Sequence, residues 1–142
     1  MAHWTHDTVV DAPPQVVFDV LADKENWNRI VPIPTSLVQP GASVRQGVGA
    51  IHKLGIGPLG ADEQVLIYEP AKRYEYKIVS RAPIRHHRGV ITFEKVGDGT
   101  RVRYRMELVP LLPVPAPLVA AGIRTALTLL LRGVKREVAR RA

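Results

Sequence analysis

Apolar residues recur at helical spacing near the N-terminus. The pair Pro13-Pro14 comes immediately before apolar positions that lie three and four residues apart. Proline suits the first helical turn because it has no N–H group to leave unpaired, so this pattern predicts a short helix over residues 13–22. A second short turn is expected over residues 24–30, where it carries Trp27 and ends before Pro32.

The C-terminal part of the chain carries a longer apolar stripe. Its members recur every three or four residues, which predicts a long helix over residues 116–140. Six residues form this stripe: Val119, Ile123, Leu127, Leu130, Val134 and Val138. Arg124 and Arg132 interrupt the apolar runs, and on that ground no membrane-spanning helix is expected.

Between these helices the apolar residues alternate with polar ones, as they do in strands. Six strands are predicted, over residues 35–39, 48–54, 62–69, 73–80, 86–95 and 100–109. A further extended segment begins near His3 and runs to Val10. In the last strand, apolar residues from Val102 to Leu108 alternate with arginines and Glu107, which predicts a sheet with one buried and one solvated face.

The order of these elements constrains the architecture. Strands that follow one another through short turns pair antiparallel, and the turn at Gly97-Asp98-Gly99 is typical of a hairpin. A sheet of about seven strands curls, and its apolar face needs a cover, which only the C-terminal helix is apolar enough to provide. We therefore expect an α+β fold in which a curved antiparallel sheet surrounds the long helix. The space between them is a natural ligand cavity.

Composition and charge narrow the functional classes. The 142 residues correspond to one domain, and the absence of cysteine excludes disulfides, thiolate catalysis and cysteine-ligated metals. The net charge of +7 is scattered along the chain and no nucleic-acid reader motif accompanies it, so we expect no nucleic-acid binding and at most weak contact with anionic membranes. The first residues lack the features of a secretory signal, and a cytoplasmic protein is expected, as a monomer or homodimer.

The histidines are the first candidates for chemistry. His87 is in phase with Gly89, Ile91 and Phe93, so we expect it to point inward, with Gly89 leaving room for a ligand above the sheet. Its imidazole exchanges protons near neutral pH, which makes His87 the candidate catalytic residue. No histidines have the spacing and nearby carboxylates of a zinc enzyme, and we expect neither a metal nor a cofactor.

Aromatic and apolar residues predicted on the inner face are candidates for the wall of a ligand cavity. Tyrosine combines a large apolar body with a hydroxyl that needs a partner when buried. Eight residues are expected to bind the ligand: Trp27, Tyr74, Tyr76, His87, Tyr104, Met106, Ile123 and Leu127. Among the carboxylates, Glu75 and Glu107 are expected on the solvated outer face, whereas the pattern leaves Glu63 unassigned.

Several motifs occur in an order that is similar to a known family. They are Val10-Asp11-Ala12-Pro13-Pro14-Gln15-Val16-Val17-Phe18-Asp19-Val20-Leu21, Gly47-Val48-Gly49-Ala50, Tyr68-Glu69-Pro70 and Phe93-Glu94-Lys95-Val96-Gly97-Asp98-Gly99-Thr100. With them the chain resembles the START-like (SRPBCC, birch-allergen-type) superfamily, in its polyketide cyclase/dehydrase-like branch. The resemblance implies one domain over residues 1–142 with a helix-grip fold and an internal apolar cavity.

Three functions remain open at this point. The first is binding or carriage of a hydrophobic small molecule, either aromatic and polyketide-like or lipid-like. The second is catalysis on such a molecule, as a cyclase or dehydratase, with tyrosine or histidine moving protons. The third is a non-catalytic interaction protein. An enzyme needs polar groups that converge at one point of the cavity, whereas an interaction protein needs a filled core and a large apolar outer patch.

Overall fold

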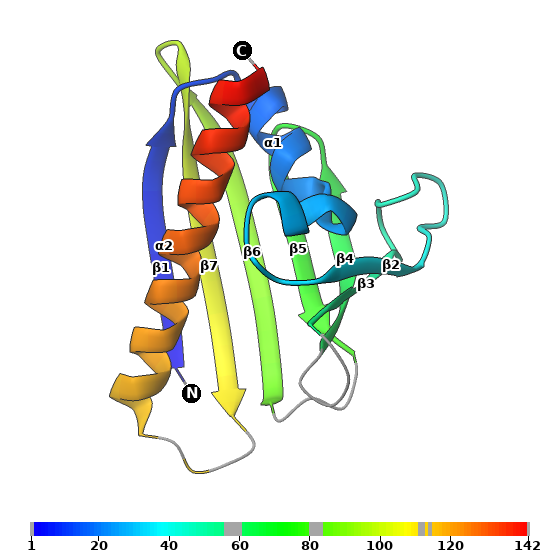
Figure 1. Cartoon of the computed structure of the whole chain (residues 1–142), viewed down its shortest axis with the longest axis vertical. Helices are drawn as coiled ribbons and strands as arrows, with labels where there is room; N and C mark the ends of the chain where they lie inside the picture. Colours follow the sequence, from blue (N-terminus) through cyan, green and yellow to red (C-terminus); the bar gives the residue numbers. More distant parts are fainter. Residues whose placement is uncertain (1, 56–60, 80–83, 111–112, 114, 142) are drawn as a thin grey trace.

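A seven-stranded antiparallel sheet and a long C-terminal helix face one another in the computed structural model (Figure 1). The structure describes residues 2–55, 61–79, 84–110, 113 and 115–141. The strands are β1 (Ala2–Val10), β2 (Thr35–Gln39), β3 (Ile51–Leu54), β4 (Ala61–Glu69), β5 (Arg73–Ile78), β6 (Ile84–Val96) and β7 (Gly99–Pro110). The helices are α1 (Pro14–Ala22), the 3-10 helix η1 (Lys24–Arg29) and α2 (Ala116–Arg141). The predicted α+β helix-grip architecture is confirmed.

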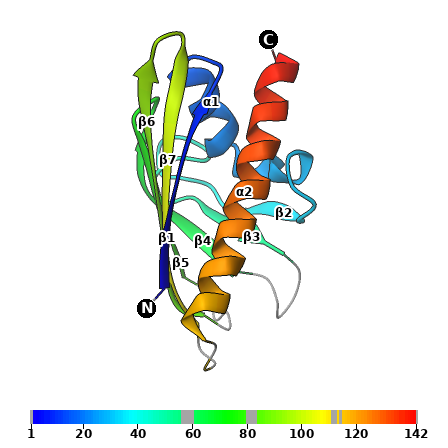
Figure 2. The same ribbon diagram turned by 90° about the vertical axis from the view of Figure 1, so that its left-hand side faces the viewer.

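The sheet order places the first and the last strand side by side. The order is β1-β7-β6-β5-β4-β3-β2, so the first strand pairs with the last and the remaining strands follow as a meander. Figure 2 shows α2 along one face of this curved sheet, with α1 covering the same face near the C-terminal end of α2. The two short helices after β1 thus complete the cover that α2 begins.

The alternation in β7 gives the strand one buried and one exposed face, as the sequence predicts. Val102 and Tyr104 are buried on the inner face, while Arg103 and Arg105 are exposed on the outer face. Because successive side chains of a strand point to opposite faces, this register places one side of the whole sheet against the core.

The expected start of β3 is wrong. The sequence predicts a strand from Val48, but β3 begins at Ile51 and the preceding residues form turns. Gly49 has a φ of +90°, a conformation that L side chains rarely adopt. It therefore interrupts the extended conformation before Ile51. Val48 is consequently exposed and does not share the buried position of His52. The strand predicted to end at Ser80 stops at Ile78, and Ser80 lies outside the described residues.

Glu75 lies on the outer face as expected, but it is not solvated. Its side chain is only 1% exposed because the guanidinium groups of Arg73 and Arg88 cover it and donate hydrogen bonds to both of its oxygens. Burial opposes ionisation of Glu75, yet the two arginines outweigh it and lower its pKa. Alternation predicts the face of a side chain correctly here and misjudges its depth.

The apolar stripe of α2 is confirmed in full. Its six members are buried against the sheet and α1: Val119, Ile123, Leu127, Leu130, Val134 and Val138. Near its C-terminal end the helix approaches the end of η1 so closely that a Cβ atom on Gly133 would lie 2.2 Å from the carbonyl oxygen of Ile30. Gly133 therefore allows α2 to pack directly on the backbone that follows η1.

The expectation that interruption of the apolar runs rules out a membrane span is wrong by the criteria of length and composition. The segment Pro117–Arg141 is long and apolar enough to cross a membrane by those two criteria alone, despite Arg124 and Arg132. The core helix of a folded domain meets the same criteria, and 39% of the apolar window of this helix is buried in the structure.

Candidate functional site

A cavity of about 760 Å³ lies between the inner face of the sheet, the end of η1 and the N-terminal half of α2. Its volume falls in the range of small-molecule binding sites, which is roughly 300–1,000 Å³. The buried part of the wall is formed by Trp27, Val31, Glu63, Tyr76, Tyr104, Leu127 and Leu130. The exposed part consists of residues such as Ile33, Gly122, Ala126 and Leu129, so the cavity opens to solvent beside α2.

The structure brings most of the predicted cavity residues together. Five of the eight line this cavity: Trp27, Tyr76, Tyr104, Met106 and Leu127. Tyr74, His87 and Ile123 are buried on the expected inner surfaces, but they are not among the described residues that line the space. A role in ligand binding for all eight residues stays a prediction.

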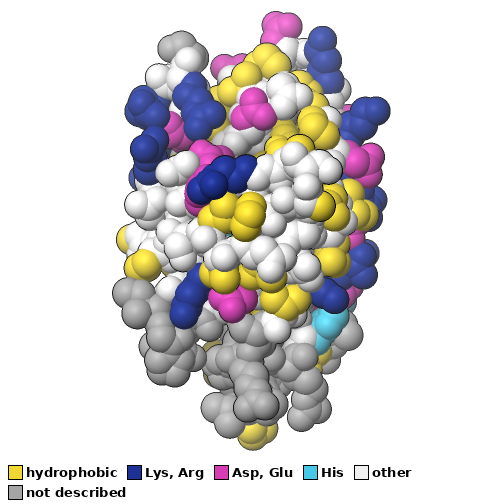
Figure 3. Space-filling model, turned by 90° about the vertical axis from the view of Figure 1, so that its right-hand side faces the viewer, with side chains coloured by type: hydrophobic (Ala, Val, Ile, Leu, Met, Phe, Trp, Pro, Cys, Tyr) yellow, Lys and Arg dark blue, Asp and Glu magenta, His cyan; other side chains and the backbone are white. Residues whose placement is uncertain are grey.

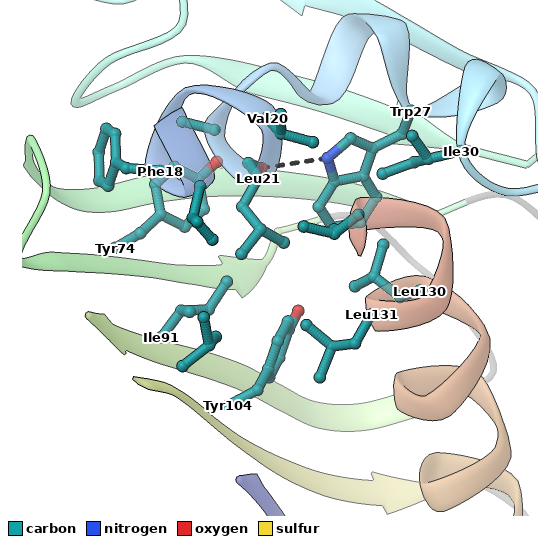
Figure 4. Packing of buried hydrophobic residues seen from close by; sticks show 14 of the residues in the cluster. Phe18, Val20, Leu21, Trp27, Ile30, Tyr74, Ile91, Tyr104, Leu130 and Leu131 are labelled. Carbon is teal, nitrogen blue, oxygen red and sulfur yellow. Dashed lines mark hydrogen bonds between the residues drawn. The ribbon is translucent and has the colours of Figure 1, made fainter. Parts of the chain in front are cut away.

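Figure 4 shows how the buried wall is held. The indole nitrogen of Trp27 donates a hydrogen bond of 3.0 Å to the carbonyl oxygen of Leu21, which ties η1 to α1. The ring of Tyr104 stands up from the sheet between Ile91 and Leu131 of α2. Residues from η1, the sheet and α2 therefore fix the positions of the two aromatic side chains.

The room expected above Gly89 is already filled. Tyr76 pairs with Gly89 across β5 and β6, and its ring folds over the glycine. A Cβ atom at position 89 would lie 2.3 Å from Cζ of Tyr76. Gly89 thus makes space for a protein side chain and not for a ligand.

Replacing Gly89 with alanine should therefore disturb the site. We expect the added methyl group to displace the Tyr76 ring and to lower the free energy of unfolding by about 1–3 kcal/mol, as overpacking of a core does. Denaturant unfolding checks this, with Gly122→Ala as control because a Cβ atom there meets nothing within 4 Å. Equal stability of Gly89→Ala and wild type would contradict the close contact.

A buried ion pair lies beneath the cavity and was not predicted. Nζ of Lys24 donates a hydrogen bond of 2.8 Å to Oε1 of Glu63, and the Lys24 side chain is completely buried. Burial lowers the pKa of Lys24, while the carboxylate of Glu63 acts in the opposite direction. Lys24 is not among the lining residues, so it holds Glu63 from behind while Glu63 faces the cavity.

Aromatic rings surround the Lys24 ammonium group on its remaining sides. Its Nζ lies 3.4 Å from the ring centroid of Tyr76, 5.1 Å from that of Tyr74 and 5.2 Å from that of Trp27. The faces of such rings attract a cation within about 6 Å. The same rings that give the cavity its aromatic wall therefore compensate in part for the loss of water around Lys24.

His87 lies next to this ion pair. Its ring is tilted against that of Tyr76 with a centroid distance of 5.5 Å, and its Nδ1 is 3.9 Å from Oε2 of Glu63. That distance is too long for a hydrogen bond, and Nδ1 is buried without a partner among the described residues. Burial lowers the pKa of His87, so it is neutral at pH 7.

Two tyrosine hydroxyls meet at the cavity wall. The hydroxyl groups of Tyr76 and Tyr104 share a hydrogen bond. Burial raises the pKa of both phenols, and the nearby carboxylate of Glu63 acts in the same direction. Both tyrosines are therefore neutral hydrogen-bonding groups, and with Glu63 they converge on one region of an otherwise apolar surface.

His52 is buried on the strand next to Glu63, where its Nε2 lies 2.9 Å from the side-chain oxygen of Gln46. Burial, together with the charge of Lys24, lowers the pKa of His52 to about 4. Among the described residues, no group of three or more His, Asp or Glu side chains is arranged to hold a metal ion.

The shift of His52 predicts how stability depends on pH. Between pH 6.5 and pH 4, His52 binds a proton in the unfolded chain but not in the folded chain. The free energy of unfolding therefore falls as the pH falls through this window. We expect wild type to lose about 2 kcal/mol from this group between pH 7.5 and pH 5. Denaturant unfolding at both pH values should show a smaller loss for His52→Gln and an unchanged loss for His86→Gln, whose ring is exposed. The same loss in all three proteins would contradict the assignment.

One signal in the sequence points to Glu63, and none points to Lys24. Glu63 is in phase with Val65, which is buried, so alternation in β4 places its carboxylate on the inner face. Lys24 follows the end of α1 in a turn that is too short for a periodic pattern to show which side of it is buried. The ion pair joins residues 39 positions apart and depends on the tertiary fold.

Comparisons with known proteins agree with the fold. The family model described as polyketide cyclase / dehydrase and lipid transport matches residues 1–139. No curated protein matches the chain. The fold is similar to a START superfamily protein from Mycobacterium smegmatis, with a TM-score of 0.86 and 16% identity over 100% of both chains.

Two other solved structures share the fold. The Zhui aromatase/cyclase from Streptomyces sp. R1128 has a TM-score of 0.79 and 18% identity, over 98% of this chain and 94% of the other. Ara h 8.0201 has a TM-score of 0.75 and 14% identity, over 97% of each chain. At these identities the structures show the fold alone, whereas the family match covers almost the whole sequence. The chain belongs to the polyketide cyclase/dehydrase and lipid transport family.

Proposed function

We propose that this protein binds and carries a hydrophobic small molecule, polyketide-like or lipid-like, in the cavity beside α2. The observation that carries the proposal is the cavity itself. About 760 Å³ of space is lined almost entirely by apolar and aromatic side chains and opens between exposed residues of α2 and Ile33. Removing apolar surface of a ligand from water at such a wall is favourable by roughly 25 cal/mol per Å².

Charged side chains of both signs are spread over the surface of the molecule. Figure 3 shows charged side chains of both signs distributed over one face of the molecule, with apolar side chains between them. The Arg101 and Arg103 guanidinium groups on the outer face of the sheet are both paired with Asp7. These two guanidinium groups are thus engaged within the protein.

Native mass spectrometry of the purified protein tests the proposal. We expect a species heavier than the chain by one small molecule, which is lost under denaturing conditions and can be identified after extraction. A protein that is recovered as the bare chain and that also binds no hydrophobic probe in titrations would contradict a carrier function.

Catalysis on such a ligand is a second candidate, and one observation favours it. Glu63, Tyr76 and Tyr104 present polar atoms at one region of the apolar wall, as an acid–base site requires. His87, the residue predicted to transfer protons, lies behind this region and contacts Glu63 and Tyr76. Because His87 does not line the cavity, it acts on a ligand through Glu63 or Tyr76 under this function, and His87→Ala should lower turnover by about 10²–10⁴-fold while ligand affinity changes far less. If wild type forms no product from any ligand that it binds, the carrier function remains.

A further inference from the structure

The polar region of the cavity contains a hydrogen-bond acceptor that the protein does not use. Glu63 is the only charged side chain among the described residues that line the cavity. Its Oε1 accepts the hydrogen bond from Lys24, whereas no described residue donates a hydrogen bond to Oε2. An ionised carboxylate accepts hydrogen bonds and donates none. The unused position therefore suits a donor.

A second unused polar atom lies close to Oε2 of Glu63. Nδ1 of His87 is 3.9 Å from Oε2 of Glu63 and is buried without a partner among the described residues. One oxygen atom placed beside the line that joins them is within reach of both, because the two atoms are 3.9 Å apart and hydrogen bonds to oxygen span about 2.5–3.2 Å. A hydroxyl group is able to donate to Oε2 and to accept from Nδ1–H at the same time.

The one ammonium group nearby is out of reach of a ligand. Lys24 is completely buried behind Glu63, and its Nζ is surrounded by Glu63 and aromatic rings. A carboxylate ligand at this end would meet the carboxylate of Glu63, and no free cation lies beside it among the described residues that line the cavity. A pure hydrocarbon would remove water from Oε2 without replacing the hydrogen bond, which is costly for a charged group.

We propose that the cavity selects hydrophobic molecules that carry a neutral hydroxyl group, which donates its proton to Oε2 of Glu63, over hydrocarbons and over molecules that end in a carboxylate. This inference rests on the proposed function of ligand binding. It assigns Glu63 as the residue that determines specificity and Lys24 as the residue that positions it.

Three probes with the same ring system separate these classes. Pyrene, 1-hydroxypyrene and pyrene-1-carboxylate are titrated into the protein at pH 7, and binding is followed by fluorescence. We expect 1-hydroxypyrene to bind at least about tenfold more tightly than either of the others, because a hydrogen bond to a charged group contributes roughly 1.5–3 kcal/mol. Equal affinities for pyrene and 1-hydroxypyrene, or preferred binding of the carboxylate, would overturn the inference.

A double variant links the preference to the ion pair. Lys24→Met/Glu63→Leu removes both charges together, and we expect it to bind pyrene more tightly than 1-hydroxypyrene, since the hydroxyl proton then loses its acceptor at position 63. The matched control is Arg45→Met/Glu25→Leu, which removes an exposed ion pair outside the cavity and should keep the wild-type order. A preference for 1-hydroxypyrene that survives in the double variant would overturn the role of Glu63.

Two further outcomes keep the test decisive. If the double variant does not fold, Glu63→Gln replaces it and should reduce the preference for 1-hydroxypyrene at least about threefold, because a neutral acceptor forms the weaker hydrogen bond. If none of the three probes binds to wild type, the proposed function fails and the inference fails with it. Binding of pyrene without a hydroxyl preference overturns only the inference.

Discussion

Replacing Glu63 with leucine is expected to lower the free energy of unfolding by about 3–5 kcal/mol, because removal of one partner leaves a buried charge uncompensated. The Lys24 side chain is completely buried, and its described hydrogen bond is the one to Glu63 at 2.8 Å. The aromatic faces around Nζ compensate only in part for the lost carboxylate. A small domain has a total stability of about 5–15 kcal/mol, so the expected loss is a large share of it.

The double variant Lys24→Met/Glu63→Leu is the control for this prediction. Apolar residues of similar volume often replace a buried ion pair at little cost, so most of the lost stability should return. Urea unfolding at pH 7 measures all three proteins. A loss below about 1 kcal/mol for Glu63→Leu would show that Lys24 is not held in its buried position as a cation.

The second large effect is expected for Leu131→Ala. This change should lower the free energy of unfolding by about 2–5 kcal/mol, as truncation of a buried leucine does when it leaves a void. Leu131 is 2% exposed and is not among the residues that line the cavity. Its neighbour Leu130 is also buried but borders the cavity, so its truncation enlarges an existing space instead of creating a closed one.

The comparison of the two leucines is therefore more informative than either value. We expect Leu130→Ala to cost at least about 1 kcal/mol less than Leu131→Ala, because the penalty rises with the volume of the new cavity. Denaturant unfolding of both variants gives the difference directly. A larger loss for Leu130→Ala would mean that the region next to Leu130 is closely packed and not open.

The sequence predicts the order of elements and the inner faces because these depend on local periodicity. Tyr76, Tyr104 and Leu127 reach the cavity wall as alternation and helical spacing predict. The same patterns carry no information on depth. Tyr74 and Ile123 point to the expected side yet lie away from the space, and Glu75 is buried beneath two arginines on the outer face.

The features that periodicity misses arise from contacts between distant segments. Lys24 of η1 and Glu63 of β4 meet only in the folded chain, and the Tyr76 ring occupies the space over Gly89 because β5 and β6 pair in that register. β3 starts three residues later than expected because Gly49 adopts a positive φ, which the spacing of apolar residues does not reveal. Tertiary contacts and backbone conformation, and not patterning, determine these parts of the site.

Titration of pyrene into wild type and a cavity-filled variant tests the central claim most directly. Gly122 and Ala126 lie one helical turn apart on the part of α2 that lines the cavity, and a Cβ atom at Gly122 meets nothing within 4 Å. Gly122→Phe/Ala126→Phe should therefore fill the space without displacing the sheet. Leu118→Phe is the control, because Leu118 is exposed on the same helix outside the cavity lining.

We expect wild type and Leu118→Phe to bind one pyrene per chain with equal affinity. The filled variant should bind it at least about tenfold more weakly, which corresponds to a loss of about 1.4 kcal/mol or more. Circular dichroism confirms that all three proteins are folded. Wild-type affinity in the filled variant would contradict the claim that the cavity beside α2 is the ligand site.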